Sequence, residues 1–577
     1  MRRAFRRRAP ENLGIGNVVA TTHHLKDSSH QAGIRSRQRC ARLLLIAMLL
    51  VVRIGAAELA VITDCDEVFN YWEPLHFLLY GSGLQTWEYS PEYALRSYLY
   101  LLLFKIPVLW WRWIGRGLGS EKTAAFQIIR IVNAGSCFVA EVSLAFSMDQ
   151  LYQASNTGNW YLLLSAMSAG MFYASPSVLP SSFTMIQFMF AYASWLSGKQ
   201  LVSMMLVANA VLVGWPFVGL LGIPLLLPVE RRLPPGRFVV LAGVYAASTL
   251  AVMTLVDSAY YGRIVVAPMR LVLYNVFPNK DRGPEVFGTE PWSYYIKNSN
   301  LNFPLLFAFA VWYAAVQLLH VLRLLGKRTG FASSADWRLC KVEALVFGAF
   351  LSWLAVFSAQ AHKEERFLYP IYPLVCWGAA RCTVVWRSFE RGTRRIGRFL
   401  MRALLVLGVV ASWSRIIGQQ RFYAAPFKVF RHLAKMHCAQ SACTLCMGDE
   451  WHHFPSSFFL PGNTTLRFVR MNASSLLPKP FVSTNIVPEG MNDRNAPVYD
   501  DRFVASIAEE CDFFAGLVND VKAPPAMFRN WTLLATATFL DRNQARGLCR
   551  AFYIPGCSMR LPTRSFVVLT KAPRETS

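Results

Sequence analysis

The chain has 577 residues, of which 54% are hydrophobic and only 16% charged, with a mean hydropathy of +0.30. A soluble protein of this length needs far more polar surface, so the composition excludes that class and predicts a polytopic membrane protein. The net charge of +25 does not indicate a nucleic-acid partner, because Lys and Arg fall mostly in an N-terminal tail and in short loops between apolar segments.

The first 42 residues are rich in Arg and poor in acids. Such a start is typical of an organelle transit peptide or of a cytosolic tail that orients the first span; the apolar segment that follows directly favours the tail. That segment, residues 43–62, is long enough to cross a bilayer although Arg53 and Glu58 interrupt it. We interpret it as an uncleaved signal anchor.

Apolar windows of spanning length predict about eleven transmembrane helices, with the N-terminus in the cytosol. This topology places the basic loops around Arg112, Arg116 and Lys122, Arg231–Arg237, 323–341 and 387–395 in the cytosol. Pro residues and the sequence Gly214-Trp215-Pro216 break the middle windows, so a re-entrant pair that preserves parity is an alternative there. The windows are 43–62, 98–114, 123–149, 159–175, 182–198, 201–228, 238–256, 301–322, 342–361, 367–386 and 399–417.

Eleven crossings put residues 419–577 on the luminal side, where we expect an α+β domain. Three glycosylation sequons occur there, at Asn463, Asn472 and Asn530. An even number of cysteines on an oxidising side indicates disulfides. A zinc site formed by Cys443-x-x-Cys446 and nearby histidines is the weaker alternative, because there is no second Cys-x-x-Cys pair. The six cysteines are Cys438, Cys443, Cys446, Cys511, Cys549 and Cys557, and the histidines are His437, His452 and His453.

Luminal loop 63–97 combines acids with aromatic rings, which suits a sugar substrate. One carboxylate can remove the proton of an incoming sugar hydroxyl. Glycoside hydrolysis needs a second carboxyl as acid, whereas a phosphate leaving group needs cations. The structural alternative for the acids is a solvated turn or a helix N-cap. The structural alternative for the aromatic rings is packing in the core. The candidate residues of this loop are Asp64, Asp66, Glu67, Tyr71, Trp72, Glu73, Trp87, Glu88 and Arg96.

Two further luminal segments carry candidates. The turn 362–366 reads HKEER, and its His362, Lys363 and Arg366 suit a lipid-linked phosphate; a solvated turn with internal ion pairs explains it as well. Loop 257–300 contains Tyr274 and Glu290, which suit a glycan or lipid-phosphate groove, although interfacial anchoring explains most of its aromatic residues.

These motifs resemble those of the endoplasmic-reticulum α-1,2-mannosyltransferase family of asparagine-linked glycosylation, in the polytopic GT-C class. The resemblance covers about residues 43–560 and is specific, since HKEERF and TWEYSP together do not arise from composition. The matching segments are DCDEVFNYWEP (64–74), QTWEYSP (85–91), LRSY (95–98), LPSSF (179–183), GWPF (214–217), LYNVF (273–277), GTEPW (288–292), HKEERFLYPIYPL (362–374) and FPSSFFLP (454–461).

The resemblance implies transfer of mannose from dolichyl-phosphate-mannose to a dolichol-diphosphate-linked oligosaccharide in the ER lumen. The new bonds are α-1,2, formed with inversion, and are those of the seventh and ninth mannoses. It implies an all-α GT-C membrane domain over 43–418 and a luminal domain over 419–577, without a cofactor or metal. Related enzymes use an acid of the first luminal loop as base, which favours Asp66 with Glu67 beside it, and Asp64 as second choice.

Two other functions compete with this one. A GT-C mannosyltransferase of glycosylphosphatidylinositol assembly shares donor and fold, but TWEYSP and the sequon-bearing C-terminal segment favour the N-glycan enzyme. A transporter or lipid flippase is also compatible with intramembrane charges. The chain has no internal repeat, and its candidate charges gather on one face of the membrane.

Overall fold

The computed structural model describes residues 39–115, 122–229, 234–277, 288–326, 334–389, 396–436, 442–470, 476–482, 502–519 and 526–571. The predicted N-terminal tail lies almost wholly outside these ranges. The chain divides after Met48, and the packing given below is that of residues 49–577.

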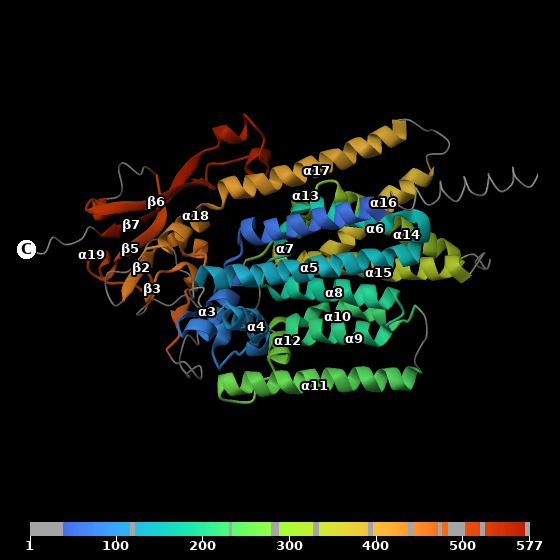
Figure 1. The fold of residues 1–577 in the computed structure, drawn as a ribbon, viewed down its shortest axis with the longest axis horizontal. Helices are drawn as coiled ribbons and strands as arrows, with labels where there is room; N and C mark the ends of the chain where they lie inside the picture. The colour runs from blue at the N-terminus through green and yellow to red at the C-terminus, as the bar shows by residue number, and fades with distance from the viewer. Residues whose placement is uncertain are drawn as a thin grey trace, which may run out of the picture. The chain divides into compact units, whose positions relative to one another are not determined.

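Six described helices are long and apolar enough to cross a membrane, so the chain is a multi-pass membrane protein. They are Arg39–Leu59, α5 (Lys122–Tyr152), α11 (Pro235–Tyr261), α14 (Leu306–Gly326), α15 (Ser334–Ala359) and α17 (Ile396–Phe422). Shorter apolar helices pack between them, with α8 and α6 against α5 and α16 against α14 (Figure 1). These are α6 (Thr157–Met167), α7 (Ala169–Ala174), α8 (Pro180–Leu196), α9 (Gln200–Asn209), α10 (Gly219–Gly222) and α16 (Tyr372–Phe389).

A buried ion pair explains how the first helix tolerates Arg53. The guanidinium donates hydrogen bonds to both carboxylate oxygens of Glu141 on α5, at 2.9 and 2.7 Å, and neither side chain is more than 1% exposed. An unpaired charge at this depth is costly, so the two side chains neutralise each other inside the helical core.

The segment predicted to cross the membrane at 98–114 is a helix on the same side as the first loop, and that prediction was wrong. The loop contains α2 (Cys65–Glu67), α3 (Glu73–Tyr80) and α4 (Tyr98–Ile114). The Arg112 guanidinium at the end of α4 lies 4.9 Å from the ring centre of Tyr80 in α3, and Lys122 Nζ donates to the carbonyl oxygen of Gly462 at 2.9 Å.

A hydrocarbon core about 30 Å thick cannot separate groups in contact. Arg112 and Lys122 therefore lie beside the first loop and the C-terminal segment, not across the membrane from them as predicted; Arg116 is outside the described residues. Figure 1 shows α3 and α4 at the end of the helices that faces the sheet. Hydropathy alone does not distinguish a helix that lies along a membrane from one that crosses it.

The window 201–228, predicted as a single span, is a helical hairpin of two limbs, so it adds a limb instead of preserving parity as the re-entrant alternative required. Its first limb continues from α9 through a π-helical turn at Ala210–Gly214, and its second runs through short helices between Pro216 and Leu226. Gln200 Nε2 donates to the carbonyl oxygen of Leu226 at 2.9 Å, so the two ends of the hairpin meet. The chain reverses at Trp215, whose backbone is extended ahead of Pro216.

The hairpin has two limbs where one span was predicted, and α4 does not cross where one span was predicted. The number of crossings before α11 is therefore unchanged. Tyr261, at the end of α11, donates from its hydroxyl to the carbonyl oxygen of Arg96 at 2.7 Å, so α11 ends beside the first loop as the topology requires. Two short helices follow on that side, α12 (Ala267–Val276) and α13 (Tyr294–Asn302).

The C-terminal part is a mixed five-stranded sheet in the order β3-β2-β5-β7-β6. Strand β2 is parallel to β3 and β5, and β7 is antiparallel to β5 and β6. Helix α18 (Ala425–Leu433) packs against β6 and β7, and α19 (Ile507–Glu510) precedes β5. The strands are β2 (Cys443–Met447), β3 (Thr464–Phe468), β5 (Phe513–Val518), β6 (Trp531–Leu540) and β7 (Thr563–Lys571).

Disulfide bonds cross-link the C-terminal part of the chain. Cys446 pairs with Cys511 and Cys549 with Cys557, and Cys443 is disulfide-bonded too. The Cys-x-x-Cys pair is therefore no zinc site, since its sulfurs are already bonded. His437 and Cys438 lie outside the described residues. A two-stranded ladder between β1 (Leu84–Gln85) and β4 (Lys479–Pro480) ties the C-terminal part to the first loop.

Candidate active site

Asp64 and Asp66 lie at the start of α2, where the chain leaves the first apolar helix. The Asp64 carboxylate accepts the backbone N–H of Asp66 at 2.9 Å and is the N-cap of α2, as the structural alternative anticipated. The cap fixes the turn and leaves the second oxygen of Asp64 and the side chain of Asp66 directed away from it.

Arg366 joins the two acids to the HKEER turn. Its Nη1 donates to Asp64 Oδ2 at 2.7 Å and its Nη2 to Asp66 Oδ2 at 2.6 Å, and Glu364 is a third carboxylate on Nη2. Residues 300 and 302 positions apart are thus in contact, and the two segments predicted to share the site do so. The turn is followed by a short 3-10 helix over Glu365–Ile371.

The two carboxylates differ in acidity because Arg366 affects them unequally. Burial raises the pKa of Asp64 to about 7, with Arg366 opposing and the charges of Asp66 and Glu364 adding to the rise. Burial also acts on Asp66, but the charge and hydrogen bond of Arg366, helped by Arg96 and His362, hold its pKa below the ordinary value. The side chains are 28% and 38% exposed, so both carboxylates remain open to a ligand.

Glu67 and Glu73 are buried anchors. Glu67 accepts hydrogen bonds from the Ser177 hydroxyl at 2.7 Å and the Val178 N–H at 3.1 Å, which fix the loop between α7 and α8. Glu73 accepts from the hydroxyl of Ser456 and from the N–H and hydroxyl of Ser457, at 2.9, 2.6 and 2.7 Å. Both acids hold neighbouring segments in place and are closed to solvent.

Tyr71, Glu88 and Arg96 form a second polar group near Asp66. Arg96 Nη1 donates to the Tyr71 hydroxyl at 2.7 Å, and its Nε is paired with Glu88. Tyr71 and Arg96 line a largely apolar cavity together with residues of the 200–226 hairpin and of α12. Tyr71, Glu88 and Arg96, three of the residues predicted from the sequence of this loop, are therefore in contact through Arg96.

The predicted tryptophans pack in the interior. Trp72 is fully buried, with its ring centre 4.1 Å from that of Phe126, so it offers no face to a sugar. Trp87 is 6% exposed and lies against Tyr93 and Tyr274, at 4.7 and 5.5 Å between ring centres. For these rings the packing alternative describes the structure.

His362 and Lys363 hold the turn against residues 288–290 of loop 257–300. The ring nitrogens of His362 lie 2.9 Å from the carbonyl oxygen of Gly288 and 3.1 Å from Glu364 Oε1. Lys363 is buried, and its Nζ donates to the carbonyl oxygen of Glu290 at 2.7 Å. The hydrogen bond to Glu364 raises the pKa of His362, against the effect of burial.

Asp64 lines two further cavities that sequence reasoning missed. One is bounded by Glu365, Tyr369, Arg415 and Gln419. The other reaches the C-terminal part of the chain. Arg415 and Gln419 come from α17, which reads as an ordinary apolar span, so no sequence signal marks them.

Two groups of described residues bring three metal-ligand atoms within 4.8 Å: Asp64, Cys65 and Asp66, and Glu450, His452 and His453. At the first, the Arg366 guanidinium already occupies the position of a cation between the two carboxylates. Of the sequons, Asn463 and Asn530 lie in exposed turns just before β3 and β6, and Asn472 is outside the described residues.

Comparisons with known proteins identify the family. The sequence pattern of the Alg9-like mannosyltransferase family matches residues 44–461. The chain belongs to this family. It is 34% identical to alpha-1,2-mannosyltransferase ALG9 of Mus musculus, over 88% of this chain and 85% of the relative. The protein of that name from Saccharomyces cerevisiae is 32% identical, over 86% and 89%.

Other family resemblances are weaker or concern the fold alone. GPI mannosyltransferase 3 of Candida albicans is 25% identical, over 55% of this chain and 59% of the relative. Among solved structures, ArnT from Cupriavidus metallidurans bound to undecaprenyl phosphate superposes with a TM-score of 0.50 and 11% identity, over 92% of this chain and 98% of that one. This mannosyltransferase therefore has the ArnT-like GT-C fold that its motifs predicted.

Proposed function

We propose that this enzyme transfers mannose from dolichyl-phosphate-mannose to a dolichol-diphosphate-linked oligosaccharide, forming α-1,2 bonds with inversion. Family membership and similarity to curated alpha-1,2-mannosyltransferases support this reaction. The observation that carries the site is the contact of Arg366 with Asp64 and Asp66, which gathers a base and a cation at one open place. The bonds proposed are those of the seventh and ninth mannoses of the N-glycan precursor.

Asp66 is the proposed base. Arg366 keeps its carboxylate deprotonated and fixes its orientation, so that it can accept the proton of a mannose 2-hydroxyl. That oxygen attacks the anomeric carbon from the face opposite the phosphate, and the carbon–oxygen bond to the phosphate breaks. Asp64, with a raised pKa, is the second candidate, while Glu67 positions the loop behind them.

The donor phosphate is proposed to bind beside the HKEER turn. A guanidinium has five N–H donors; Arg366 donates one to Asp64 and one to Asp66 and is ion-paired with Glu364, and we assign its remaining N–H groups to phosphate oxygens. His362, whose pKa is raised, adds charge as the phosphate leaves, and Lys363 holds the turn to Glu290. Transfer in this scheme needs no metal.

The proposed topology has eleven crossings with the N-terminus cytosolic and the active site in the ER lumen. The six long helices account for six crossings. The other five are short: α6 with α7, α8, the two limbs of the 200–226 hairpin, and α16. The membrane domain extends over 43–418 and a glycosylated luminal domain over 419–577.

The test is transfer of mannose from synthetic dolichyl-phosphate-mannose to defined lipid-linked oligosaccharides, with the linkage read by α-1,2-specific mannosidase. Asp66→Asn should lower the rate about 100- to 10,000-fold. Asp64→Asn is the matched variant, since it changes the partner on the same guanidinium. Near-normal transfer by Asp66→Asn contradicts the base, and transfer only to glycosylphosphatidylinositol precursors contradicts the acceptor.

A further inference from the structure

A cavity beside Asp64 is shared by the first loop and the C-terminal part of the chain. Thr63 and Asp64 form one wall. The opposite wall, here called the His-Arg wall, is made of Tyr423, His452, His453, Phe539 and Arg542. The two walls are connected, because Glu73 of the first loop accepts hydrogen bonds from Ser456 and Ser457, a few residues after the histidines, and Phe69 stacks on Phe454.

Arg542 is presented to this cavity by two aromatic rings. Its guanidinium carbon lies 5.2 Å from the ring centre of Tyr423 and 5.8 Å from that of Phe539, and the residue is exposed. Among the described residues its guanidinium N–H groups donate no hydrogen bond. An exposed guanidinium beside two aromatic rings, with N–H donors to spare, is suited to neighbouring hydroxyls of a sugar.

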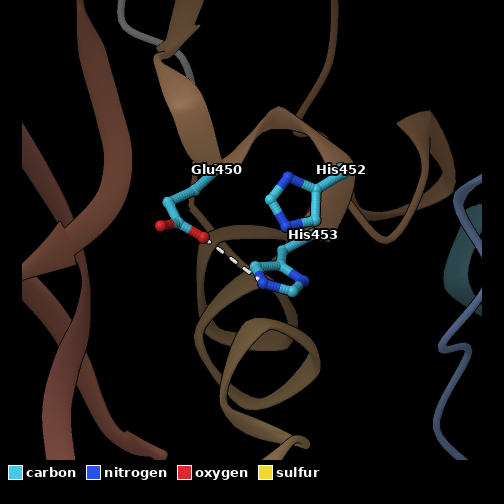
Figure 2. Close-up of side chains that lie close together, drawn as sticks. All are labelled: Glu450, His452 and His453. Carbon is cyan, nitrogen blue, oxygen red and sulfur yellow. Dashed lines mark ion pairs between the residues drawn. The ribbon is translucent and has the colours of Figure 1, made fainter. Parts of the chain in front are cut away.

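The two histidines add uncharged polar groups. Figure 2 shows both rings beside Glu450, with His453 Nε2 3.3 Å from Glu450 Oε2 and the ring centres 4.0 Å apart. Burial, then the charges of His452 and Arg542, lower the pKa of His453 to about 2, and burial and Arg542 also lower that of His452. Neutral imidazoles donate and accept one hydrogen bond each, which again matches hydroxyl groups.

A cation is the competing ligand, since Glu450, His452 and His453 bring three ligand atoms together. The charge of Arg542 acts on all three of these residues, and that of Arg564 acts on Glu450 as well. Two guanidinium groups oppose a divalent ion and favour an uncharged ligand rich in hydroxyls.

We propose that the His-Arg wall binds a mannose of the acceptor glycan and presents its neighbour to Asp64 and Asp66. The inference rests on the proposed function and goes further by assigning acceptor recognition to the C-terminal part of the chain. A sugar against this wall lies beside Asp64, which is itself in contact with the backbone of Asp66. The apolar cavity at Tyr71 and Arg96 shares no lining residue with this one.

The test uses the full chain in nanodiscs. Arg542→Ala and Arg542→Lys should each raise the KM for the acceptor about 10- to 100-fold, the loss expected for hydrogen bonds to a charged group, while kcat and the donor KM change little. Arg560→Ala, an exposed arginine of the same part of the chain, is the control with unchanged constants. An unchanged acceptor KM in both Arg542 variants overturns the proposal.

Two readouts separate this proposal from the function on which it rests. Binding of a lipid-free mannose oligosaccharide, followed by saturation-transfer NMR, should be seen in the wild type and lost in Arg542→Ala. Binding without any transfer by the wild type contradicts the function and leaves the glycan site standing; transfer without such binding contradicts the site. One equivalent of metal in the purified protein, absent from His452→Ala, overturns the proposal in favour of a metal site.

Discussion

Glu73 anchors the C-terminal part of the chain to the first loop, and its removal should be costly. The carboxylate is fully buried and accepts three hydrogen bonds from Ser456 and Ser457. In Glu73→Ala the backbone N–H of Ser457 loses its acceptor and cannot turn to another, whereas the two hydroxyls can rotate. Leaving a buried donor unsatisfied in this way costs about 1–3 kcal/mol, to which the lost packing of the side chain adds. Glu73→Gln keeps an acceptor oxygen and the side-chain volume, so it should cost only about 1 kcal/mol.

The assay is chemical unfolding of the purified protein, with acceptor kinetics measured on the same samples. Glu509→Ala is the control, because Glu509 is an exposed acid of the C-terminal part. We expect the control to have the highest free energy of unfolding, Glu73→Gln a lower one and Glu73→Ala the lowest. If the free energy of unfolding falls equally in the two Glu73 variants, the hydrogen-bond argument is refuted and the effect is due to packing. A raised acceptor KM in a fully stable Gln variant returns Glu73 to the substrate-binding role predicted from sequence.

Three further outcomes follow from the site and the sheet. With Asp66 as base the transfer rate should not fall as the pH is lowered from about 8 to about 6, because a base loses activity only as pH falls through its pKa and His362 gains charge in this range; a loss of rate on acidification centred near pH 7 assigns the base to Asp64. Arg366→Lys should lower kcat about 100-fold by misplacing both carboxylates, and a rate within about twofold of wild type contradicts this. Cys446→Ser should lower the free energy of unfolding by about 2–5 kcal/mol, because the bond to Cys511 spans 65 residues; identical denaturation curves with and without reductant contradict it.

The sequence was sufficient to predict that the two proposed site segments lie together. Acids after the first apolar helix and cations in the HKEER turn fall on the same side whenever the crossings between them have the correct parity. Arg366 does meet Asp64 and Asp66. The motifs also indicated the family and its fold, because TWEYSP and HKEERF are too specific to arise from composition.

Depth in the membrane and burial were harder to predict. Helix α4 and the 200–226 hairpin have the hydropathy of single spans, and the two errors cancelled, so the later loops kept their sides. The partners of Glu67 and Glu73 lie about 110 and 383 residues away, and nothing local distinguishes these anchors from Asp66. For the same reason Trp72 resembled a sugar platform although it packs on Phe126.

The pairing of Arg53 with Glu141 bears on how the protein is made. The first helix is synthesised before α5, so its arginine must enter the bilayer while its carboxylate partner is still 88 residues from being available. An unpaired arginine within a helix disfavours insertion by about 2.5–3.5 kcal/mol. The first helix is therefore a poor anchor until α5 arrives. We therefore expect the two helices to stabilise each other on insertion, and a truncation between them should leave the N-terminal helix less stable in the membrane.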